Sequence, residues 1–339
     1  MALEGLAPSE GEMSEKREAE EELLRLEGID SHPKQETGCV STLHSGNLIA
    51  CRFNSDNTLI ATGSADRTVK VSDAQTRAEK LTVSSHAAPI LSVAWSPTDP
   101  HILVSSDMNG SVLVTDAHSG AQLGQFKDHH KYAHRAAWSP NGRSFATCGH
   151  DRKVSVYTRE EGGEGFVLAR QREMVTLPEA ICFLDDGVTL VVSCRDDNYF
   201  HYLDTGDGTE MKVNMNALGD DHVSFTVLDM VLSPNGKMLL ASTDRSRLIL
   251  FVVGTCHQLR NYYGAVNDQL CQTRACFHPS GRLIYCTSQD QKIYCWDTVT
   301  QKVVCKLQGH KGVVRDVDVS SDGATLITCS FDKTLRVWS

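Results

Sequence analysis

An acidic or amide residue recurs along this chain at nearly constant intervals, six residues before the end of a short strand-like segment. Successive copies are separated by 42 to 47 residues, and the seven copies are Asp66, Asn109, Asp151, Asp197, Asp244, Asp290 and Asp332. Self-similarity at such a period indicates one small unit that becomes stable by stacking on its neighbours. The sequence therefore predicts seven copies of one unit, although 339 residues alone would suggest two or three separate domains.

The last copy, residues 309–339, shows most clearly what one unit contains. Val317 and Val319 alternate with Asp316 and Asp318, and this period of two places the valines on one face of a β-strand. Six copies carry a turn signal between their first two strands, such as Ser-Ser-Asp-Gly at 320–323, and the fourth has Leu-Asp-Asp-Gly at 184–187. Each copy is therefore predicted to be a strand-turn-strand unit that continues into a third strand.

This repeated unit resembles the WD40 repeat, whose copies form the four-stranded blades of a β-propeller. In that family a histidine, a hydroxyl residue, an aspartate and a tryptophan are linked by hydrogen bonds inside each blade. The resemblance assigns these roles in the last copy to His310, Thr328, Asp332 and Trp338. In the third copy it assigns them to His129, Thr147, Asp151 and Tyr157. Because buried polar groups must be paired, this relay is expected to fix the turn and the strand register of each blade.

The other copies keep the relay only in part. The first and second copies offer His44, Thr62, Asp66 and Ser72, and His86, Ser105, Asn109 and Thr115. The fourth lacks the histidine and ends in Leu203, the fifth has His222 and Asp244 with Leu250, and the sixth has Asp290 and Trp296 with Cys286 in the hydroxyl position. Copies four to six also have the longest spacings, so their loops are the least predictable.

The fold class expected from these features is all-β, a seven-bladed WD40-like β-propeller over residues 37–339 preceded by a short helical arm in residues 1–36. The ring must close, and the seventh copy ends at Ser339 after its third strand. Residues 37–43 resemble the outer strand that precedes His310, so they are expected to supply the fourth strand of the last blade. This pairing would remove an exposed sheet edge.

The segment from Ser14 to Glu27 consists of good helix formers, with Gly28 placed to end the helix. Its apolar residues Ala19, Leu23 and Leu26 form a narrow stripe on a charged rod. Two turns of stripe are too few for an isolated helix to be stable. The arm is therefore expected either to be solvated and partly frayed, or to dock on a partner or on the side of the main domain.

The net charge of −10 is concentrated in this arm, where residues 1–36 hold eleven acids against four bases. That leaves −3 for the rest of the chain, which offers no basic surface for phosphates, so direct nucleic-acid binding is not expected. No apolar run approaches a membrane span, and no secretory signal precedes the repeats. The twelve cysteines are scattered without a Cys-x-x-Cys pair, as in a reducing compartment. These features predict an intracellular protein, cytoplasmic or nuclear.

No sequence signature of catalysis or cofactor binding is present. The chain contains no His-Glu-x-x-His, P-loop or Gly-x-Ser-x-Gly motif. Several of the fourteen histidines fall at the relay position, which explains them structurally. The neighbouring Asp196 and Asp197 would point to opposite faces of a strand, so they form a poor acid/base couple. The expectation is a non-enzymatic protein without metal or cofactor.

The resemblance implies that partners bind at the top rim, where the loop carrying the relay histidine and the turn carrying the acid emerge together. Two positions in each copy should point there, one before the turn acid and one five residues past the histidine. Residues at or beside these positions that are better suited to an interface than to mere solvation are Leu91, Met108, Tyr132, His134, His150, Arg315 and Phe331. These residues are the candidate partner-binding set.

The function implied is a scaffold that binds other proteins or peptides as a subunit of a larger complex. One alternative is a G-protein β-like subunit, which would use its N-terminal helix to pair with a small partner. A second is a substrate receptor of a ubiquitin ligase. That class often carries Trp-Asp-x-Arg, whereas Trp296-Asp297 is followed here by Thr298-Val299. A third is an enzymatic propeller, which a bound metal would reveal.

Overall fold

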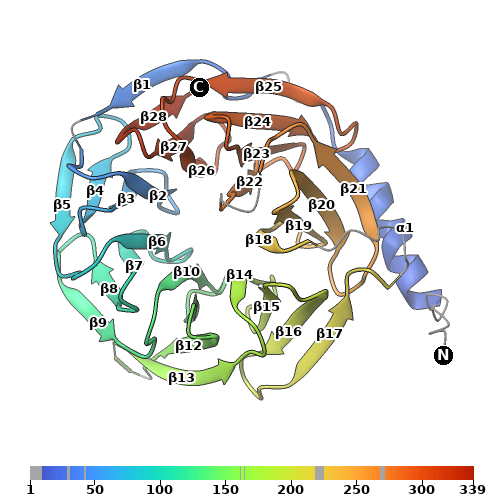
Figure 1. The fold of residues 1–339 in the computed structure, drawn as a ribbon, viewed down its shortest axis with the longest axis horizontal. Helices are drawn as coiled ribbons and strands as arrows, with labels where there is room; N and C mark the ends of the chain where they lie inside the picture. Colours follow the sequence, from blue (N-terminus) through green and yellow to red (C-terminus); the bar gives the residue numbers. More distant parts are fainter. Residues whose placement is uncertain are drawn as a thin grey trace.

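The computed structural model describes residues 10–28, 31–41, 43–160, 162–163, 165–217, 225–267 and 272–339. Within these residues it contains one α-helix and strands β1 to β28, arranged as seven four-stranded antiparallel sheets around a central axis (Figure 1). The predicted seven-bladed β-propeller with an N-terminal helix is therefore confirmed. No helix among the described residues is both long and apolar enough to cross a membrane.

The blades follow one another in chain order. Blade one is β2 (Leu48–Phe53), β3 (Leu59–Ser64), β4 (Val69–Asp73) and β5 (Glu79–Val83). Blade two is β6 (Ile90–Trp95), β7 (Ile102–Asp107), β8 (Val112–Asp116) and β9 (Gln122–Phe126). Blade three is β10 (Ala133–Trp138), β11 (Ser144–Gly149), β12 (Lys153–Arg159) and β13 (Phe166–Glu173). Blade four is β14 (Pro178–Phe183), β15 (Thr189–Cys194), β16 (Tyr199–Asp204) and β17 (Glu210–Asn214).

The last three blades complete the ring. Blade five is β18 (Val227–Leu232), β19 (Met238–Thr243), β20 (Arg247–Val252) and β21 (Gln258–Tyr263). Blade six is β22 (Ala275–Phe277), β23 (Leu283–Thr287), β24 (Lys292–Asp297) and β25 (Val303–Gln308). Blade seven is β26 (Val314–Val319), β27 (Leu326–Ser330), β28 (Leu335–Trp338) and β1 (Glu36–Val40).

Burial is greatest in the second strand of several blades and lowest in the outermost strand, and this difference explains the sequence pattern. Every residue of the second strands β3, β7 and β19 is buried, so these strands have few charged residues, as expected where both faces are covered. The outermost strands β5 and β25 alternate or are mostly exposed. Apolar side chains of adjacent blades pack face to face, and one cluster joins Ile102, Val104 and Phe145 across blades two and three.

The ring is closed by the N-terminal strand. β1 pairs antiparallel with β28, with Gly38 opposite Val337 and Val40 opposite Leu335. The backbone amide of Ser339 donates to the carbonyl of Gln35 at 2.9 Å, and Arg336 Nη1 lies 2.5 Å from Glu36 Oε2. In Figure 1 β1, in blue, lies beside the red strands of blade seven. The first and last strands of the chain therefore lie in one sheet, which leaves no unpaired edge on β28.

A chain of alternating charges lines the central channel. Arg52 Nη1 lies 2.7 Å from Asp316 Oδ1, and Asp229 Oδ1 lies 3.2 Å from Arg135 Nη2 and 3.3 Å from Arg274 Nη1. Arg52, Asp316, Asp229 and Arg135 belong to the first strands of blades one, seven, five and three, and Arg274 directly precedes the first strand of blade six. All of them except Asp316 line a cavity of about 570 Å³. Because a buried charge is tolerated only with a partner, these pairs constrain how the inner strands face one another.

The helix α1 (Glu10–Arg25) docks on the propeller at the outer side of blades five and six, next to β21 (Figure 1). Ala19 and Leu23 are buried in a cluster with Leu250, Tyr262 and Trp296. Polar contacts surround this cluster. Glu22 pairs with Lys237, Glu20 Oε1 lies 3.2 Å from Arg260 Nη1, and Arg282 Nη1 donates to the carbonyl of Leu26 at 2.5 Å. Of the alternatives left open by the sequence, the structure shows docking on the main domain.

Replacing Leu23 by alanine should weaken this docking, because Leu23 is fully buried. The cavity that the substitution leaves should destabilise the docked helix by about 2–4 kcal/mol. Hydrogen exchange of the α1 amides should become faster in the variant. Leu24→Ala is the matched control, since Leu24 belongs to the same helix and is 60% exposed. Equal exchange rates in both variants would show that Leu23 does not hold the helix.

Candidate protein-interaction surface

The relay is complete in blade seven. His310 Nδ1 lies 3.0 Å from Asp332 Oδ2, and His310 Nε2 lies 2.8 Å from Thr328 Oγ1. Trp338 Nε1 donates to the same Thr328 oxygen at 3.0 Å. Burial raises the pKa of Asp332, but hydrogen bonds from Thr334 and the Lys311 amide outweigh it and lower the pKa to about 2. The turn between β27 and β28 is thus tied to the loop before β26.

Blades one and three repeat this arrangement with small differences. His129 lies 3.0 Å from Asp151 Oδ1 and 2.8 Å from Thr147 Oγ1, but the hydroxyl of Tyr157 donates to Asp128 at 3.1 Å. Asp128 was not among the residues expected from the sequence. In blade one the relay consists of His44, Thr62 and Asp66, with distances of 2.9 Å and 3.0 Å from the imidazole.

The predicted relay acid of blade two is wrong. His86 Nδ1 lies 3.0 Å from Asp107 Oδ2, and Asn109 is exposed. Asp107 Oδ1 also accepts the amides of Asn109 and Ser111 at 2.9 Å and 2.8 Å. The carboxylate therefore comes from the end of β7 and not from the turn. The repeat spacing alone favours Asn109. It does not take into account that the Asp107 carboxylate, two residues earlier, accepts the turn amides of Asn109 and Ser111.

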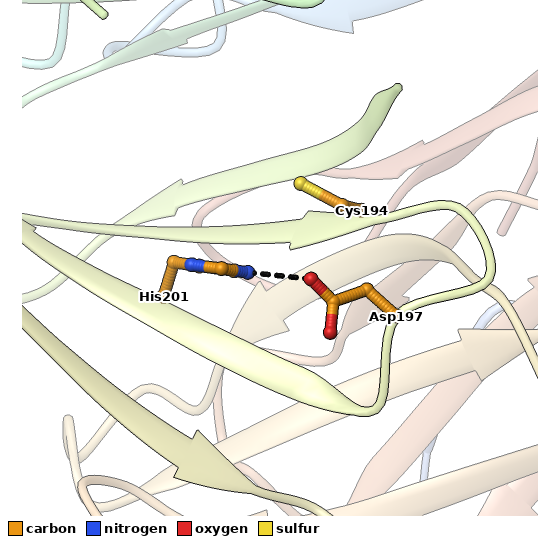
Figure 2. A group of neighbouring side chains, drawn as sticks. All are labelled: Cys194, Asp197 and His201. Atoms are coloured by element: carbon orange, nitrogen blue, oxygen red, sulfur yellow. Dashed lines mark hydrogen bonds and ion pairs between the residues drawn. The ribbon is translucent and has the colours of Figure 1, made fainter. Parts of the chain in front are cut away.

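Blade four lacks the histidine in the preceding loop, as the sequence indicates, but β16 supplies another one. Figure 2 shows His201 hydrogen-bonded to Asp197, with Cys194 on the adjacent strand β15. His201 Nε2 lies 2.9 Å from Asp197 Oδ2, and Nδ1 lies 2.6 Å from Glu210 Oε1. Cys194, Asp197 and His201 have the residue types of a metal site, with ligand atoms within 4.8 Å of one another. Since both imidazole nitrogens already face carboxylates, we interpret the group as a rearranged relay.

Blades five and six depart further from the pattern. His222 lies outside the described residues. In blade six Asp290 accepts a hydrogen bond from the hydroxyl of Tyr294 at 2.9 Å, and Trp296 Nε1 donates to the carbonyl of Tyr263. Cys286 Sγ donates to the carbonyl of Thr287. The predicted members of blade six are therefore each bonded, but not to one another.

The top rim is built the same way in all seven blades. One backbone amide in the turn between the second and third strands donates to a carbonyl in the loop before the first strand, at 2.7 to 3.0 Å. The donors are Ala65, Met108, His150, Arg195, Asp244, Gln289 and Phe331. In blades four and five the donor lies one residue away from the position before the turn acid, which is Asp196 in blade four and Thr243 in blade five. Turn and loop of each blade therefore lie side by side, and they define the top rim.

The second set of rim positions coincides with an irregularity in the sheets. In six blades the pairing of the first two strands shifts by one residue, at Ile49, Leu91, His134, Glu179, Leu228 and Arg315. Such a bulge bends the strand and redirects a side chain. These residues therefore stand apart from the regular alternation of their strands. Strict alternation along a strand does not predict such a bulge. Counting five residues past the relay histidines of blades one, two, three and seven gives four of the positions, whereas blade four has no such histidine and Leu228 lies six residues past His222.

The candidate residues differ in their exposure. Met108, Tyr132 and Phe331 are 41%, 43% and 39% exposed. Leu91, His150 and Arg315 are half-buried, whereas His134 is only 4% exposed. His134 Nε2 lies 3.3 Å from the carbonyl of Glu179 and 3.8 Å from Cys148 Sγ. The His134 side chain therefore packs beneath the rim and is not accessible to a partner.

Four of the candidates lie at the rim of blades two and three, and we name them the aromatic rim patch: Leu91, Met108, Tyr132 and His150. The rings of Tyr132 and His150 are 5.3 Å apart, and His150 also stacks edge-on against His134 at 5.2 Å. A Cβ on Gly110, whose φ is 81°, would come within 2.5 Å of the carbonyls of His129 and Lys131. Glycine is required there, and it brings the Met108 turn against the Tyr132 loop.

Arg315 and Phe331 form a separate contact in blade seven. The guanidinium carbon of Arg315 lies 5.1 Å from the centre of the Phe331 ring, and Nη2 lies 3.5 Å from Gln272 Oε1. Blade one lies between this pair and the aromatic rim patch and contributes Ala65 and the buried Ile49. The six candidates other than the buried His134 therefore form two groups and not one surface.

Seven four-stranded blades, a histidine–aspartate relay in several of them and a closing strand from the other end of the chain define a repeat β-propeller. The family model described as WD domain, G-beta repeat matches residues 37–73, 78–116, 120–158, 258–297 and 301–339. Because these matches cover more than half of the chain, it belongs to the WD40-repeat family. The unmatched residues 159–257 contain blade four and most of blade five, where the relay and the rim turns deviate.

Two similar proteins are components of assemblies by name. The chain is 24% identical over 313 residues to the guanine nucleotide-binding protein subunit beta of Oryza sativa subsp. indica, covering 76% of this chain and 82% of that protein. It is 26% identical over 296 residues to the U5 small nuclear ribonucleoprotein 40 kDa protein of Dictyostelium discoideum, covering 86% and 81%. These similarities support a protein-interaction scaffold.

Replacing Asp107 by alanine should lower the free energy of unfolding by about 2–4 kcal/mol, because it leaves His86 and two turn amides without their buried acceptor. Asn109→Ala should change the stability by only about 0.5 kcal/mol, since that side chain is exposed. Urea unfolding of both variants measures the difference. The reverse order would restore Asn109 as the relay residue.

Stability should also decrease on acidification. Burial lowers the pKa of His44, His134 and His310 below the ordinary 6.5. The unfolded chain therefore binds protons first, and each such group removes up to about 1.4 kcal/mol per pH unit below its unfolded pKa. Asp318 has the opposite sign, because burial raises its pKa to about 6.

The contribution of His134 can be isolated with a His134→Gln variant. Its urea midpoint should fall less than that of the parent protein between about pH 7.5 and about pH 5.5, since the variant lacks one proton-binding group in the unfolded chain. An equal fall in both proteins would contradict a neutral, buried His134.

Proposed function

We propose that this protein is a non-enzymatic WD40 scaffold that binds a protein or peptide through its top rim, as a subunit of a larger complex. The observation that carries this proposal is the exposure of Met108 and Tyr132, which belong to a turn of blade two and a loop of blade three that lie against each other. Neighbouring exposed apolar side chains mark a binding site more often than singly scattered ones do. Aromatic residues, methionine and arginine are also the types enriched in protein interfaces.

The chemistry of the patch favours an apolar or aromatic anchor as the part of the partner that binds. Leu91 and Met108 offer apolar surface, and the rings of Tyr132 and His150 offer stacking faces 5.3 Å apart. Burial lowers the pKa of His150, so its ring is neutral at physiological pH and does not repel an apolar group. We propose that nucleic acid is not the ligand, because the propeller carries little net charge.

The G-protein β-like alternative receives less support from the structure. In that alternative the N-terminal helix would present its apolar residues to a small partner. Here Ala19 and Leu23 are buried against blades five and six, and Glu20 and Glu22 are paired with Arg260 and Lys237. A helix that uses its apolar stripe within its own chain has none left for a coiled coil. We therefore place the partner site at the rim.

The double variant Met108→Asp/Tyr132→Ala should abolish binding of a specific partner while leaving the thermal unfolding midpoint unchanged. Both side chains are exposed at the rim, and an aspartate there must be desolvated when a partner covers it. Quantitative affinity purification from the native source, compared with the parent protein, measures the loss.

Met211→Asp is the matched control, because Met211 is 51% exposed on the outermost strand of blade four, away from the rim turns. It should retain every partner of the parent protein. If the rim variant retained all partners, the rim proposal would be wrong. If both variants lost the same partner, the effect would be one of charge and not of the rim.

A further inference from the structure

Two cysteines face each other on neighbouring strands of blade six. Cys295 in β24 and Cys305 in β25 are direct register partners of an antiparallel pair. Directly opposed residues place their side chains on the same face of the sheet, with Cα atoms about 4.5–5.5 Å apart. A disulfide requires Cα atoms about 4.4–6.8 Å apart. The backbone therefore already holds this pair at a spacing at which the two sulfurs can be joined.

The two sulfurs have different environments. Cys295 is fully buried in the cluster between blades six and seven, together with Tyr285, Leu307 and Trp338. Cys305 packs against the rim of this cluster but is half-buried, because β25 is the outermost strand of its blade. A small reagent in solution can therefore reach Cys305 first, while Cys295 is protected behind it.

The electrostatics support the same division of roles. The Cys295 side chain hydrogen-bonds to the Cys305 sulfur and lowers the pKa of the Cys305 thiol, and the charge of Lys34 acts in the same direction against the effect of burial. The same hydrogen bond, together with burial, raises the pKa of Cys295. Since the thiolate is the reactive form, Cys305 is the nucleophile of the pair and Cys295 keeps its proton.

A second pair in the chain provides an internal comparison. Cys51 of blade one and Cys329 of blade seven also interact through their side chains, but both are fully buried. Burial is the main cause of a raised pKa at Cys51. This pair has proximity without access, whereas Cys295 and Cys305 have both. Cys39 is the opposite case, because it is exposed on β1.

We propose that Cys305 and Cys295 form a redox-sensitive dithiol that a peroxide converts into a cross-strand disulfide. The Cys305 thiolate attacks one peroxide oxygen, the O–O bond breaks, and the products are a Cys305 sulfenic acid and water or an alcohol. The Cys295 sulfur then attacks the sulfenic sulfur, the S–O bond breaks, and hydroxide leaves with the proton of Cys295 as water. Two electrons pass from the thiols to the peroxide, and a dithiol reductant reverses the change.

The site lies close to the closure of the ring. Lys34, whose charge acts on Cys305, belongs to the segment that connects α1 to β1, and its amide donates to the carbonyl of Ser339 at 3.3 Å. Trp338 of blade seven belongs to the same cluster as Cys295. Oxidation therefore links β24 to β25 next to blade seven, in which strands from the two ends of the chain are paired.

The test treats the folded full-length protein with a small excess of hydrogen peroxide, blocks free thiols by alkylation, and identifies the linked peptides by mass spectrometry. The expected result is a Cys295–Cys305 disulfide that dithiothreitol removes. Cys39→Ser should form it to the same extent as the parent protein, because Cys39 takes no part in it. Cys305→Ser should abolish it and leave Cys295 reduced.

The variant Cys295→Ser tests the role of Cys295 as the second thiol of the pair. In this variant the Cys305 sulfenic acid has no thiol to condense with, so it should be trapped by dimedone and proceed to the sulfinic acid. Thermal unfolding of each variant verifies that it is folded. The proposal is overturned if Cys39 is oxidised while no Cys295–Cys305 bond forms, or if Cys51–Cys329 forms equally fast in the folded protein, since reactivity would then not depend on access.

Discussion

The pairing of β1 with β28 is the interaction on which the whole propeller depends. A ring of stacked blades buries its apolar faces only when the last blade meets the first, and blade seven takes its outer strand from the other end of the chain. The same N-terminal segment places α1 on blades five and six. Helix and strand together therefore fasten three consecutive blades, and the charge pairs of the central channel hold the inner strands of five blades from within.

The relays show that the blades share a requirement to pair their buried polar groups, and that they meet it with different sets of residues. In blade two the acid is supplied by Asp107 at the end of a strand, and in blade four the imidazole is supplied by His201 from the third strand. Each solution gives the turn amides or the buried imidazole an acceptor. An unpaired group there would cost about 1–3 kcal/mol, so any geometry that satisfies it serves the fold equally well.

Surface chemistry is divided between the rim and the outer strands. The rim positions emerge at bulges and turns, where side chains escape the regular alternation of the sheet, and this is why methionine and tyrosine can stand exposed there. In the outer strand of blade six, Cys305 lies in direct register with Cys295, next to a shift in the strand pairing, and this register places a half-buried thiol opposite a buried one. Two types of surface thus arise from one repeated sheet, one at the bulges and turns of the rim and one on the outermost strands.

Most of the fold could be predicted from the sequence because its determinants are local and repeated. Turn signals and the His310–Asp332 spacing lie within one unit of about 40 residues, and seven copies of that unit leave little choice but a closed ring. Four of the bulged rim positions also follow from counting five residues past a relay histidine. Their exposure could not be reached in this way, as His134 shows, because burial depends on Cys148 and on Glu179 of the next blade.

Only the tertiary structure decided which groups meet across units or across strands. The apolar stripe of α1 was visible in the sequence, but its binding surface is assembled from blades five and six and has no local signature. The choice of Asp107 over Asn109 depends on the reach of a carboxylate to two turn amides. The pairing of Cys295 with Cys305 follows from strand register, which ten residues of sequence separation do not reveal. By itself the sequence determined the number of blades and their closure, because local spacing encodes them, whereas contacts set by three-dimensional packing required the folded ring.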